Sequence, residues 1–314
     1  MSENAKYVVG VGAANIDVHG RGRGALIMRD SNPGSMNTSC GGVTRNILEN
    51  LSRLGVGAKL ISALGDDVFA DKIRRDSQSA GIDLSHSLTV KGAASSSYLS
   101  VLDGKGDMLV AVSDMSIIKN LTLEYLDENR DMIQGAAAVV TDTCLAPELM
   151  RHLVFETARG IPVFVDPVST TYARSISDFA GGFYAIKPNL LELEVLAGIR
   201  IDDDKSLERA CDIMLEKGVR RLYVSLGSKG CCYADCDGVR ERRSLAPLTV
   251  MVNATGGGDA FTAAVVYGNV LGLCVQKTLD YALAAGIVAI SHRETINPDI
   301  SATLLEKTIE ERKA

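Results

Sequence analysis

The sequence contains no tryptophan, and proline is scarce, with seven among 314 residues. It also lacks any block of five or more basic residues, and its net charge of −6 makes nucleic acids and anionic membranes poor partners. No apolar run is long enough to span a bilayer, and the polar first residues do not resemble a signal peptide. We therefore expect a cytoplasmic protein that acts on small molecules.

The cysteines and histidines form no pattern typical of a zinc site. The seven cysteines are odd in number and unevenly spaced, as is usual for reduced thiols in the cytoplasm. Cys231, Cys232 and Cys236 lie close together, but no histidine is near them and no CxxC pair forms. We interpret them as small buried hydrophobic residues.

Strand-like apolar segments alternate with helical patterns along most of the chain. With 46% hydrophobic residues and 30 glycines, 314 residues suffice for one large core, so we expect a single domain spanning 1–314. Strands are expected at 7–15, 58–63, 137–141, 162–166, 183–186 and 221–226. Helices are expected at 67–80, 122–134, 147–159, 206–217, 257–271, 278–291 and 301–312. This alternation predicts an α/β fold with a doubly wound, mainly parallel sheet flanked by helices.

Two segments interrupt the alternation and predict a small lid. Residues 18–38 have several turn signals and no helical period, so we expect an irregular stretch there. Residues 95–102 and 108–112 predict a hairpin with one half-polar face. Together they indicate a small β-sheet inserted from about 18–38 and 93–114. Two lids packing together would bury a half-apolar face, so a homodimer is our hypothesis for the assembly.

The glycine-rich stretch before residue 260 is the strongest candidate for a functional site. Gly256, Gly257 and Gly258 precede an apolar run, residues 260–268, that predicts a buried helix beginning at about Gly257. Glycine lets an anion approach the backbone closely, and a helix N-terminus offers free N–H groups to a phosphate. Asp259 follows in the first turn, where it can take a proton from an attacking hydroxyl. The alternative is a glycine-rich loop with an acidic helix cap.

The first strand has a different glycine pattern. Gly10-x-Gly12-x-x-Asn15 is similar to a dinucleotide-binding fingerprint, but asparagine replaces the third glycine and no helical pattern follows. We therefore do not expect NAD binding. Asp17 comes just after this strand, where a carboxylate can accept hydrogen bonds from a vicinal diol or can simply form a turn.

Other polar residues follow predicted strands or precede helices. Gly41 and Gly42 allow a ligand close to the backbone, and Asn46 lies one turn further on the next helix. Asn189 and Glu192 share one side of a first helical turn, where Glu192 would meet phosphate only through hydrated Mg²⁺. Each also has a structural explanation, since Asn189 and Glu192 match a capping box and the two glycines match a tight strand–helix turn.

The motifs together resemble the pfkB (ribokinase-like) family of sugar and nucleoside kinases over essentially the whole chain. Gly41-Gly42-x-x-x-Asn46 with Gly55 resembles its N-terminal signature. Thr255-Gly-Gly-Gly-Asp259 resembles its C-terminal signature, and Asn189-x-x-Glu192 its Mg²⁺–phosphate motif. The resemblance implies a ribokinase-like fold and an enzyme that transfers phosphate from ATP to an alcohol.

The resemblance also implies a role for each candidate residue. Asp259 would be the catalytic base, and the amides of Gly256, Gly257 and Gly258 would form the anion hole. The remaining implied residues are Asn15, Asp17, Gly41, Gly42, Asn46 and Ser97 for the substrate, Lys187, Asn189, Ser225, Gly227, Gly230, Asn253 and Thr255 for the nucleotide, and Glu192 and Asp166, through water, for Mg²⁺.

Within the family, residues 13–18, 30–34, 96–100 and 107–112 most resemble bacterial pseudouridine kinases. This implies phosphorylation of the 5′-hydroxyl of pseudouridine, with another nucleoside or sugar as the alternative acceptor. Pseudouridine has an N1–H where uridine has a C5–H, and we hypothesise that Ser31, Asn32 or a nearby carbonyl accepts it. Asn253 stands where many members have an acidic residue that helps to bind a monovalent cation, so activation by K⁺ is left open.

Overall fold

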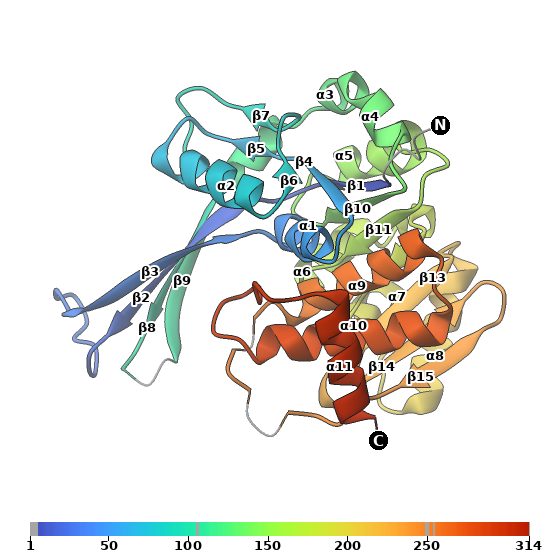
Figure 1. The fold of residues 1–314 in the computed structure, drawn as a ribbon. Helices are drawn as coiled ribbons and strands as arrows, with labels where there is room; N and C mark the ends of the chain where they lie inside the picture. The colour runs from blue at the N-terminus through green and yellow to red at the C-terminus, as the bar shows by residue number, and fades with distance from the viewer. Residues whose placement is uncertain (1–5, 105–106, 249–250, 254, 314) are drawn as a thin grey trace.

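A mainly parallel sheet forms the centre of the protein (Figure 1). The computed structural model describes residues 6–104, 107–248, 251–253 and 255–313. In these residues the sheet has nine strands in the order β15-β14-β13-β12-β11-β10-β1-β4-β6. Strand β14 is antiparallel to both of its neighbours, β13 and β15, and the remaining pairs are parallel. The strands are β1 Tyr7–Val11, β4 Gly57–Ile61, β6 Ile82–Asp83, β10 Ala138–Asp142, β11 Val163–Asp166, β12 Ala185–Ile186, β13 Arg221–Ser225, β14 Cys231–Asp235 and β15 Arg240–Arg243.

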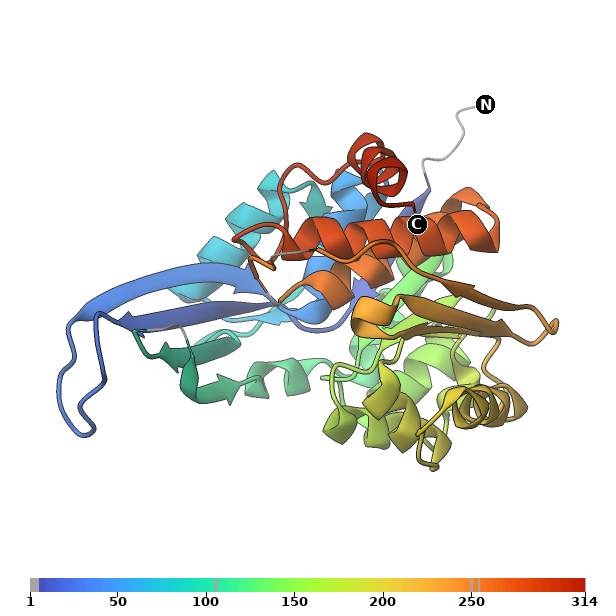
Figure 2. The same cartoon turned by 90° about the horizontal axis from the view of Figure 1, so that it is seen from below.

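Helices cover both faces of this sheet, giving three layers (Figure 2). One face is covered by α1 Val43–Arg53, α2 Val68–Ser79, α9 Gly257–Leu271 and α10 Val275–Ile290, and α11 Ala302–Arg312 packs on α10. The other packs against α3 Leu123–Glu128, α4 Arg130–Gln134, α5 Pro147–His152, α6 Thr170–Ile176, α7 Leu190–Ala197 and α8 Asp204–Glu216. The near-continuous apolar strands fit burial on both faces. The doubly wound α/β fold expected from the sequence is confirmed.

A second sheet projects from the body of the protein, and we call it the lid (Figure 1). Its order is β3-β2-β8-β9, with β2 parallel to β8 and the other pairs antiparallel. Its strands are β2 Asn15–Gly22, β3 Gly34–Gly41, β8 Ser97–Leu102 and β9 Met108–Asp114. A third, two-stranded sheet pairs β5 Ala63–Leu64 with β7 Leu88–Thr89; both strands come between β3 and β8 in the sequence.

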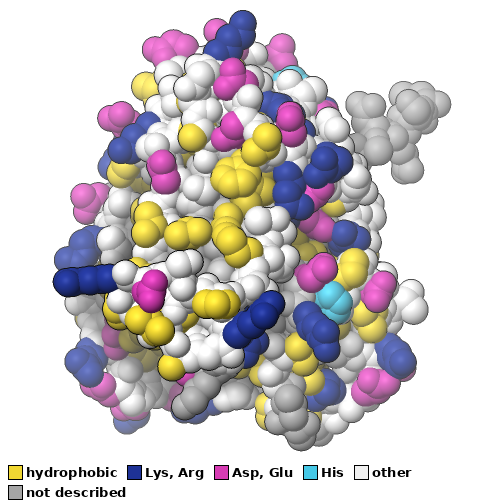
Figure 3. Space-filling model, turned by 90° about the vertical axis from the view of Figure 1, so that its left-hand side faces the viewer, with side chains coloured by type: hydrophobic (Ala, Val, Ile, Leu, Met, Phe, Trp, Pro, Cys, Tyr) yellow, Lys and Arg dark blue, Asp and Glu magenta, His cyan; other side chains and the backbone are white. Residues whose placement is uncertain are grey.

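Cross-strand register gives the lid one polar and one apolar face. Asp17 and His19 share a face with their partners Ser39 and Asn37, because directly paired residues point the same way. The opposite face carries exposed apolar side chains: Met36, Leu99, Val110 and Val112 are 40% to 73% exposed. Hydrophobic side chains gather in the middle of the view that faces the lid (Figure 3).

Several local predictions were wrong. Residues 18–38 are not one irregular stretch, because β2 and β3 reach far into them by pairing with each other and with β8. The helix expected at 122–134 is broken at Asn129, whose side chain bonds His86 and the Tyr125 carbonyl. The helix expected at 147–159 turns into a π-helix at Leu153–Thr157. Helix α6, capped by Ser169, was not anticipated.

In the residues that the structure describes, no helix combines the length and apolar character needed to cross a bilayer.

Candidate active site

The glycine run opens a buried helix, as the sequence predicts. Gly256 is the N-cap of α9 with φ +81°, and a Cβ there would lie 1.9 Å from the Thr295 carbonyl oxygen. Only glycine fits such a position. Gly257 and Gly258 are the first two helical residues, whose N–H groups have no partner within a helix. Those groups, together with the helix dipole, make this end of α9 suited to an anion.

Asp259 lies at this helix end and contacts a residue far away in the sequence. Asn46, on the first turns of α1, donates from Nδ2 to Asp259 Oδ2 at 2.8 Å. Burial raises the pKa of Asp259 to about 7, and the charges of Asp166 and Asp142 act in the same direction. The Asn46 hydrogen bond and the Lys187 charge oppose that rise. A carboxyl group with this pKa is suited to take a proton near neutral pH.

A further carboxylate beside Asp259, that of Asp166, ends strand β11. Asp166, at the end of β11, forms a buried ion pair with Lys187, with 2.8 Å between Oδ2 and Nζ. Thr262 of α9 also donates to Asp166 Oδ2, and the Val168 amide donates to Oδ1. Burial opposes the charge of Lys187, but Asp166, Glu192 and Asp259 outweigh it and raise its pKa. Lys187 therefore stays cationic, and a methyl group on Gly258 would come within 3.2 Å of its Nζ.

Asn189 and Glu192 form the capping box at the start of α7. The Asn189 side chain accepts from the Glu192 amide, and Glu192 Oε2 accepts from the Asn189 amide, both at 2.9 Å. Asn189 also forms an isolated bridge with Ser225, at the end of β13. Burial raises the pKa of Glu192, and its bond to the Asn189 amide opposes this. The structural interpretation of this motif is thus correct, and it brings Glu192 to the same sheet edge as Asp166.

The substrate candidates gather where the lid joins the body. Asn15 donates to Asp17 Oδ1 at 2.7 Å, and a Cβ on Gly41 would lie 2.4 Å from Asp17 Oδ2. Gly42 has φ +98° and precedes α1. Burial raises the pKa of Asp17, and the Asn15 bond lowers it. Asp17 and Asn46 therefore flank the junction of β3 with α1.

The glycines of the first strand serve packing. A Cβ on Gly10 would lie 2.6 Å from Leu48 Cδ1, and one on Gly12 would lie 2.2 Å from Thr44 Oγ1. Both glycines allow α1 to lie close against β1. No helix follows β1 directly, since the chain continues into β2. The geometry is therefore not that of a dinucleotide-binding turn.

A mostly apolar cavity of about 420 Å³ adjoins the start of α9. Gly257, Gly258, Ser225, Gly227 and Gly230 form part of its wall. Its apolar lining includes Leu245, Met251, Phe261, Leu283, Ile287 and Ile290. A volume and lining of this kind suit a flat, mostly apolar ring system with polar groups at one end.

Some candidate residues lie elsewhere. Ser31 and Asn32 belong to the β2–β3 loop at the far end of the lid (Figure 1), and the Asn32 side chain bonds Ile27 and the Asp30 carbonyl within that loop. Ser97 pairs with Ile16, which puts its side chain on the lid face opposite Asp17. Those three are thus not brought together with Asp259.

Asn253 and Thr255 hold the loop that enters α9. The Asn253 side chain accepts from the Thr255 amide and hydroxyl and donates to the Arg293 carbonyl at 3.2 Å. Both side chains are thus engaged within the loop rather than among the residues that line the cavity.

Sequence reasoning missed Asp142 and Arg45. Asp142 ends β10, is fully buried, and its Oδ2 accepts from the Ala13 amide and from the amide and hydroxyl of Thr44. The sequence signal that could have found it is an aspartate directly after the predicted strand 137–141. In the described part of the chain, no group of three or more His, Cys, Asp or Glu side chains is arranged to hold a metal ion.

Comparison with known proteins identifies the class to which this fold and site belong. A model of the pfkB family carbohydrate kinases matches residues 5–302, and the chain belongs to that family. It is accordingly a kinase of the sugar and nucleoside type, which confirms the resemblance drawn from the motifs.

Individual relatives and solved structures show which members of the family the chain is similar to. The chain is 37% identical to pseudouridine kinase of Escherichia coli (strain K12) over 94% of both sequences. It is 23% identical to guanosine-inosine kinase of Exiguobacterium acetylicum over 88% of this chain and 90% of that protein. A candidate sugar kinase from Clostridium perfringens superposes with a TM-score of 0.90 at 31% identity, covering 99% of this chain and 98% of that one. Arabidopsis thaliana ribokinase complexed with ribose and ATP, 20% identical over 98% and 99% of the two chains, shares the fold with a TM-score of 0.83.

Proposed function

We propose that this protein phosphorylates the 5′-hydroxyl of pseudouridine, with Mg·ATP as the phosphate donor. The observation that carries the kinase chemistry is Asp259, a carboxyl group with a raised pKa at the N-terminus of α9, beside Asn46. Pseudouridine is favoured as the acceptor by the 37% identity with the E. coli enzyme over nearly the whole chain.

In the proposed reaction, Asp259 takes the proton from the acceptor hydroxyl while that oxygen attacks the γ-phosphorus in line; the bond from this phosphorus to the β–γ bridging oxygen breaks, and ADP leaves. The amides at the start of α9 stabilise the charge that develops on the transferred group. Lys187, held against Gly258 by its ion pair with Asp166, adds a fixed positive charge on the same side. The lid closes over the acceptor and excludes water, which would otherwise compete as an acceptor.

The nucleotide base is proposed to occupy the apolar cavity beside α9. Ser225, Gly227 and Gly230 bound that cavity, so a base there would direct its phosphates toward Gly257 and Gly258. The sugar would lie under the lid, where Asp17 accepts hydrogen bonds from its hydroxyls. Asn46 would then lie between the sugar and Asp259.

The residues at the sheet edge fit a hydrated Mg²⁺ rather than a directly ligated one. Both oxygens of Asp166 already accept protein hydrogen bonds, and Glu192 Oε2 accepts the Asn189 amide. Mg²⁺ usually keeps several waters and is held by one or two carboxylates with substrate phosphates. Bound there, it would neutralise phosphate charge, and Asp166 and Glu192 would hold its waters. A solved E. coli relative, 19% identical, was crystallised with ATP and Mg²⁺.

We further propose that K⁺ is not required. The Asn253 side-chain oxygen already accepts from the Thr255 amide and hydroxyl, and its nitrogen donates to the Arg293 carbonyl in the loop after α10. This neutral, engaged oxygen is a weaker cation ligand than a carboxylate would be at this position.

A homodimer formed through the lids is also part of the proposal. Met36, Leu99, Val110 and Val112 expose 73%, 40%, 54% and 61% of their surface on one lid face. An apolar group of this kind on a projecting sheet is typical of a surface that a second chain covers.

The test is a panel of ribose, fructose, adenosine, inosine, uridine and pseudouridine with Mg·ATP, with Asp259→Asn as the control. We expect pseudouridine to have the highest kcat/KM and uridine to be about 10⁴-fold poorer if an acceptor in the site pairs with N1–H. Equal rates for these two nucleosides would refute discrimination at N1. A better substrate elsewhere in the panel would identify the alternative, another nucleoside or sugar kinase of the family.

A further inference from the structure

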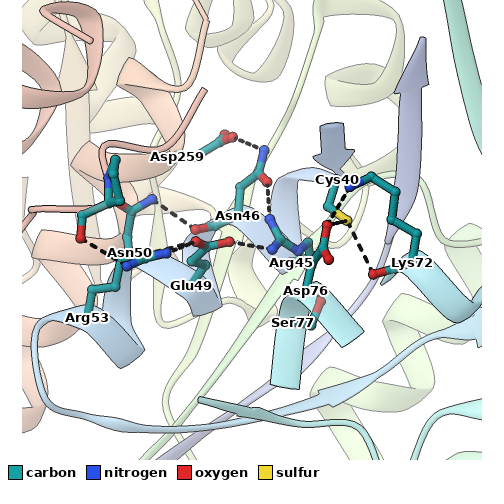
Figure 4. Close-up of polar contacts among 11 residues, drawn as sticks. Cys40, Arg45, Asn46, Glu49, Asn50, Arg53, Lys72, Asp76, Ser77 and Asp259 are labelled. Atoms are coloured by element: carbon teal, nitrogen blue, oxygen red, sulfur yellow. Dashed lines mark hydrogen bonds and ion pairs between the residues drawn. The ribbon is translucent and has the colours of Figure 1, made fainter. Parts of the chain in front are cut away.

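Arg45 is a buried cation next to the contact between Asn46 and Asp259 (Figure 4). Only 3% of its surface is exposed. Its Nε donates to Ser77 Oγ and its Nη1 donates to Asn46 Oδ1, each at 3.2 Å, while its Nη2 pairs with Glu49. Burying a guanidinium is costly unless every such contact is made, so its position on α1 calls for an explanation beyond packing.

The side-chain amide of Asn46 is held at both ends. Oδ1 accepts from Arg45, and Nδ2 donates to Asp259 Oδ2 at 2.8 Å. A guanidinium has donors only, and an ionised carboxylate has acceptors only. Therefore only one of the two amide orientations satisfies both neighbours. Without Arg45, the Asn46 oxygen is no longer drawn away from Asp259.

We propose that Arg45 is a positioning residue for the reaction: it fixes the Asn46 amide so that Asn46 anchors one oxygen of Asp259. This inference rests on the proposed role of Asp259 as the base. Anchoring Oδ2 leaves Oδ1 as the oxygen that takes the proton from the acceptor. A base held in this way needs no reorganisation when the hydroxyl arrives.

A series of ion pairs along α1 connects Arg45 with the protein surface. Glu49, whose side chain is 8% exposed, pairs with both Arg45 and Arg53. Arg53 donates to Glu49 Oε1 from Nε at 2.9 Å and from Nη2 at 2.6 Å, and its Nη1 reaches the Pro298 carbonyl. Because Glu49 keeps a second partner, removing Arg45 does not leave it as an unpaired buried charge.

The charges around Asp259 define what a loss of positioning does. Asp166 from β11 and Asp142 from β10 disfavour its ionised form, while Lys187 and the Asn46 amide favour it. Losing the oriented amide removes one of the two favourable contacts. The pKa of Asp259 should then rise further, and the acid limb of the pH–rate profile should move to higher pH.

The experiment measures kcat, KM and the pH dependence of kcat/KM for Arg45→Met in the wild-type and Asn46→Ala backgrounds. We expect Arg45→Met to lower kcat about 10- to 100-fold, with the KM for ATP unchanged. The acid limb should move up by about half a pH unit or more. In the Asn46→Ala background, the same substitution should change neither quantity further, because Arg45 acts through Asn46.

Arg45→Lys keeps a donor and should recover part of the lost kcat. The matched control is Lys72→Met, which removes another ion pair of the same polar region, with Asp76, and does not contact Asn46. It should leave kcat and the limb unchanged. To guard against misfolding of Arg45→Met, Arg45→Met/Glu49→Gln removes both charges of the buried pair, and its melting temperature is measured beside its kinetics.

The outcomes distinguish failure of the proposed function from failure of the positioning role of Arg45. If the wild-type protein transfers phosphate to no acceptor in the panel, the proposed function fails and the positioning role fails with it. If the wild-type protein is active and Asp259→Asn is inactive, but Arg45→Met leaves the acid limb unmoved, only the positioning role is overturned. An equal Arg45→Met effect in the Asn46→Ala background overturns it as well.

Discussion

Replacing Asp259 by asparagine should remove activity and yet make the protein more stable. Folding raises the pKa of this carboxyl from its ordinary 3.8 to about 7, mainly through burial. That is a shift of about 3 units, or about 4 kcal/mol at about 1.36 kcal/mol per unit, as an upper bound. Because part of the Asp259 side chain is exposed to solvent, which screens its charge, we expect Asp259→Asn to raise the free energy of unfolding by about 1–3 kcal/mol.

The sign of the pH dependence follows from proton binding. Between pH 3.8 and about 7, the folded state holds a proton on Asp259 that the unfolded state has lost. Wild-type stability therefore falls as the pH rises through this window, relative to a neutral side chain. The advantage of Asp259→Asn should be close to zero near pH 4 and complete above pH 7. The asparagine oxygen can still accept the Asn46 hydrogen bond.

Thermal unfolding at pH 5 and pH 8, with turnover measured in parallel, provides the assay. We expect kcat to fall about 10²- to 10⁴-fold, the usual effect of losing a general base. At pH 8, Tm should rise by roughly 1.5–4.5 °C. Asp178→Asn, an exposed position, serves as the control and should change neither quantity. A lower Tm for Asp259→Asn at pH 8, or a gain equal at both pH values, would refute the account of strained burial.

Three further predictions concern other features of the structure. Gly256→Ala should destabilise the protein and abolish turnover, because its Cβ would lie 1.9 Å from a backbone carbonyl oxygen; Gly257→Ala, whose Cβ would lie 2.9 Å from a side-chain methyl of Ile290, should keep most activity, as kinetics and melting curves will show. Replacing K⁺ by tetramethylammonium should leave the wild-type rate unchanged, whereas Asn253→Asp should make it K⁺-dependent; a strong loss of wild-type rate without K⁺ would contradict the proposal. Val110→Glu should convert a dimer into a monomer in sedimentation experiments without unfolding it, and a wild-type monomer at micromolar concentration would exclude the lid interface.

The sequence predicted the parts of the fold that depend on local patterns. Period-2 and period-3.6 patterns located the central strands and most helices, and the glycine run before an apolar segment located the start of α9. The junction of Gly41 and Gly42 with the helix carrying Asn46 was also found, because glycines before a helix have a local cause.

The remaining features depend on long-range contacts. Strand β2 has the sequence of a turn-rich loop, but it becomes a strand by pairing with β8, some eighty residues further along the chain. Arg45 has the sequence environment of a solvated helical arginine, but in the fold it is buried and donates to Ser77 of α2, some thirty residues further along the chain. Asp142 ends its strand as many turn-forming aspartates do. The Cys144 amide donates to its Oδ1 as in such a turn, but the three donors to its Oδ2 come from Ala13 and Thr44, more than ninety positions away.

The joint between β3 and α1 has a mechanical consequence. Strand β3 ends at Gly41, α1 begins at Val43, and the single residue between them, Gly42, fits only without a side chain, since a Cβ would lie 2.3 Å from the Ala13 carbonyl oxygen. A side chain at position 42 should therefore push the lid strand away from the helical turn that carries Asn46, and so disturb at once the lid and the hydrogen bond that anchors Asp259.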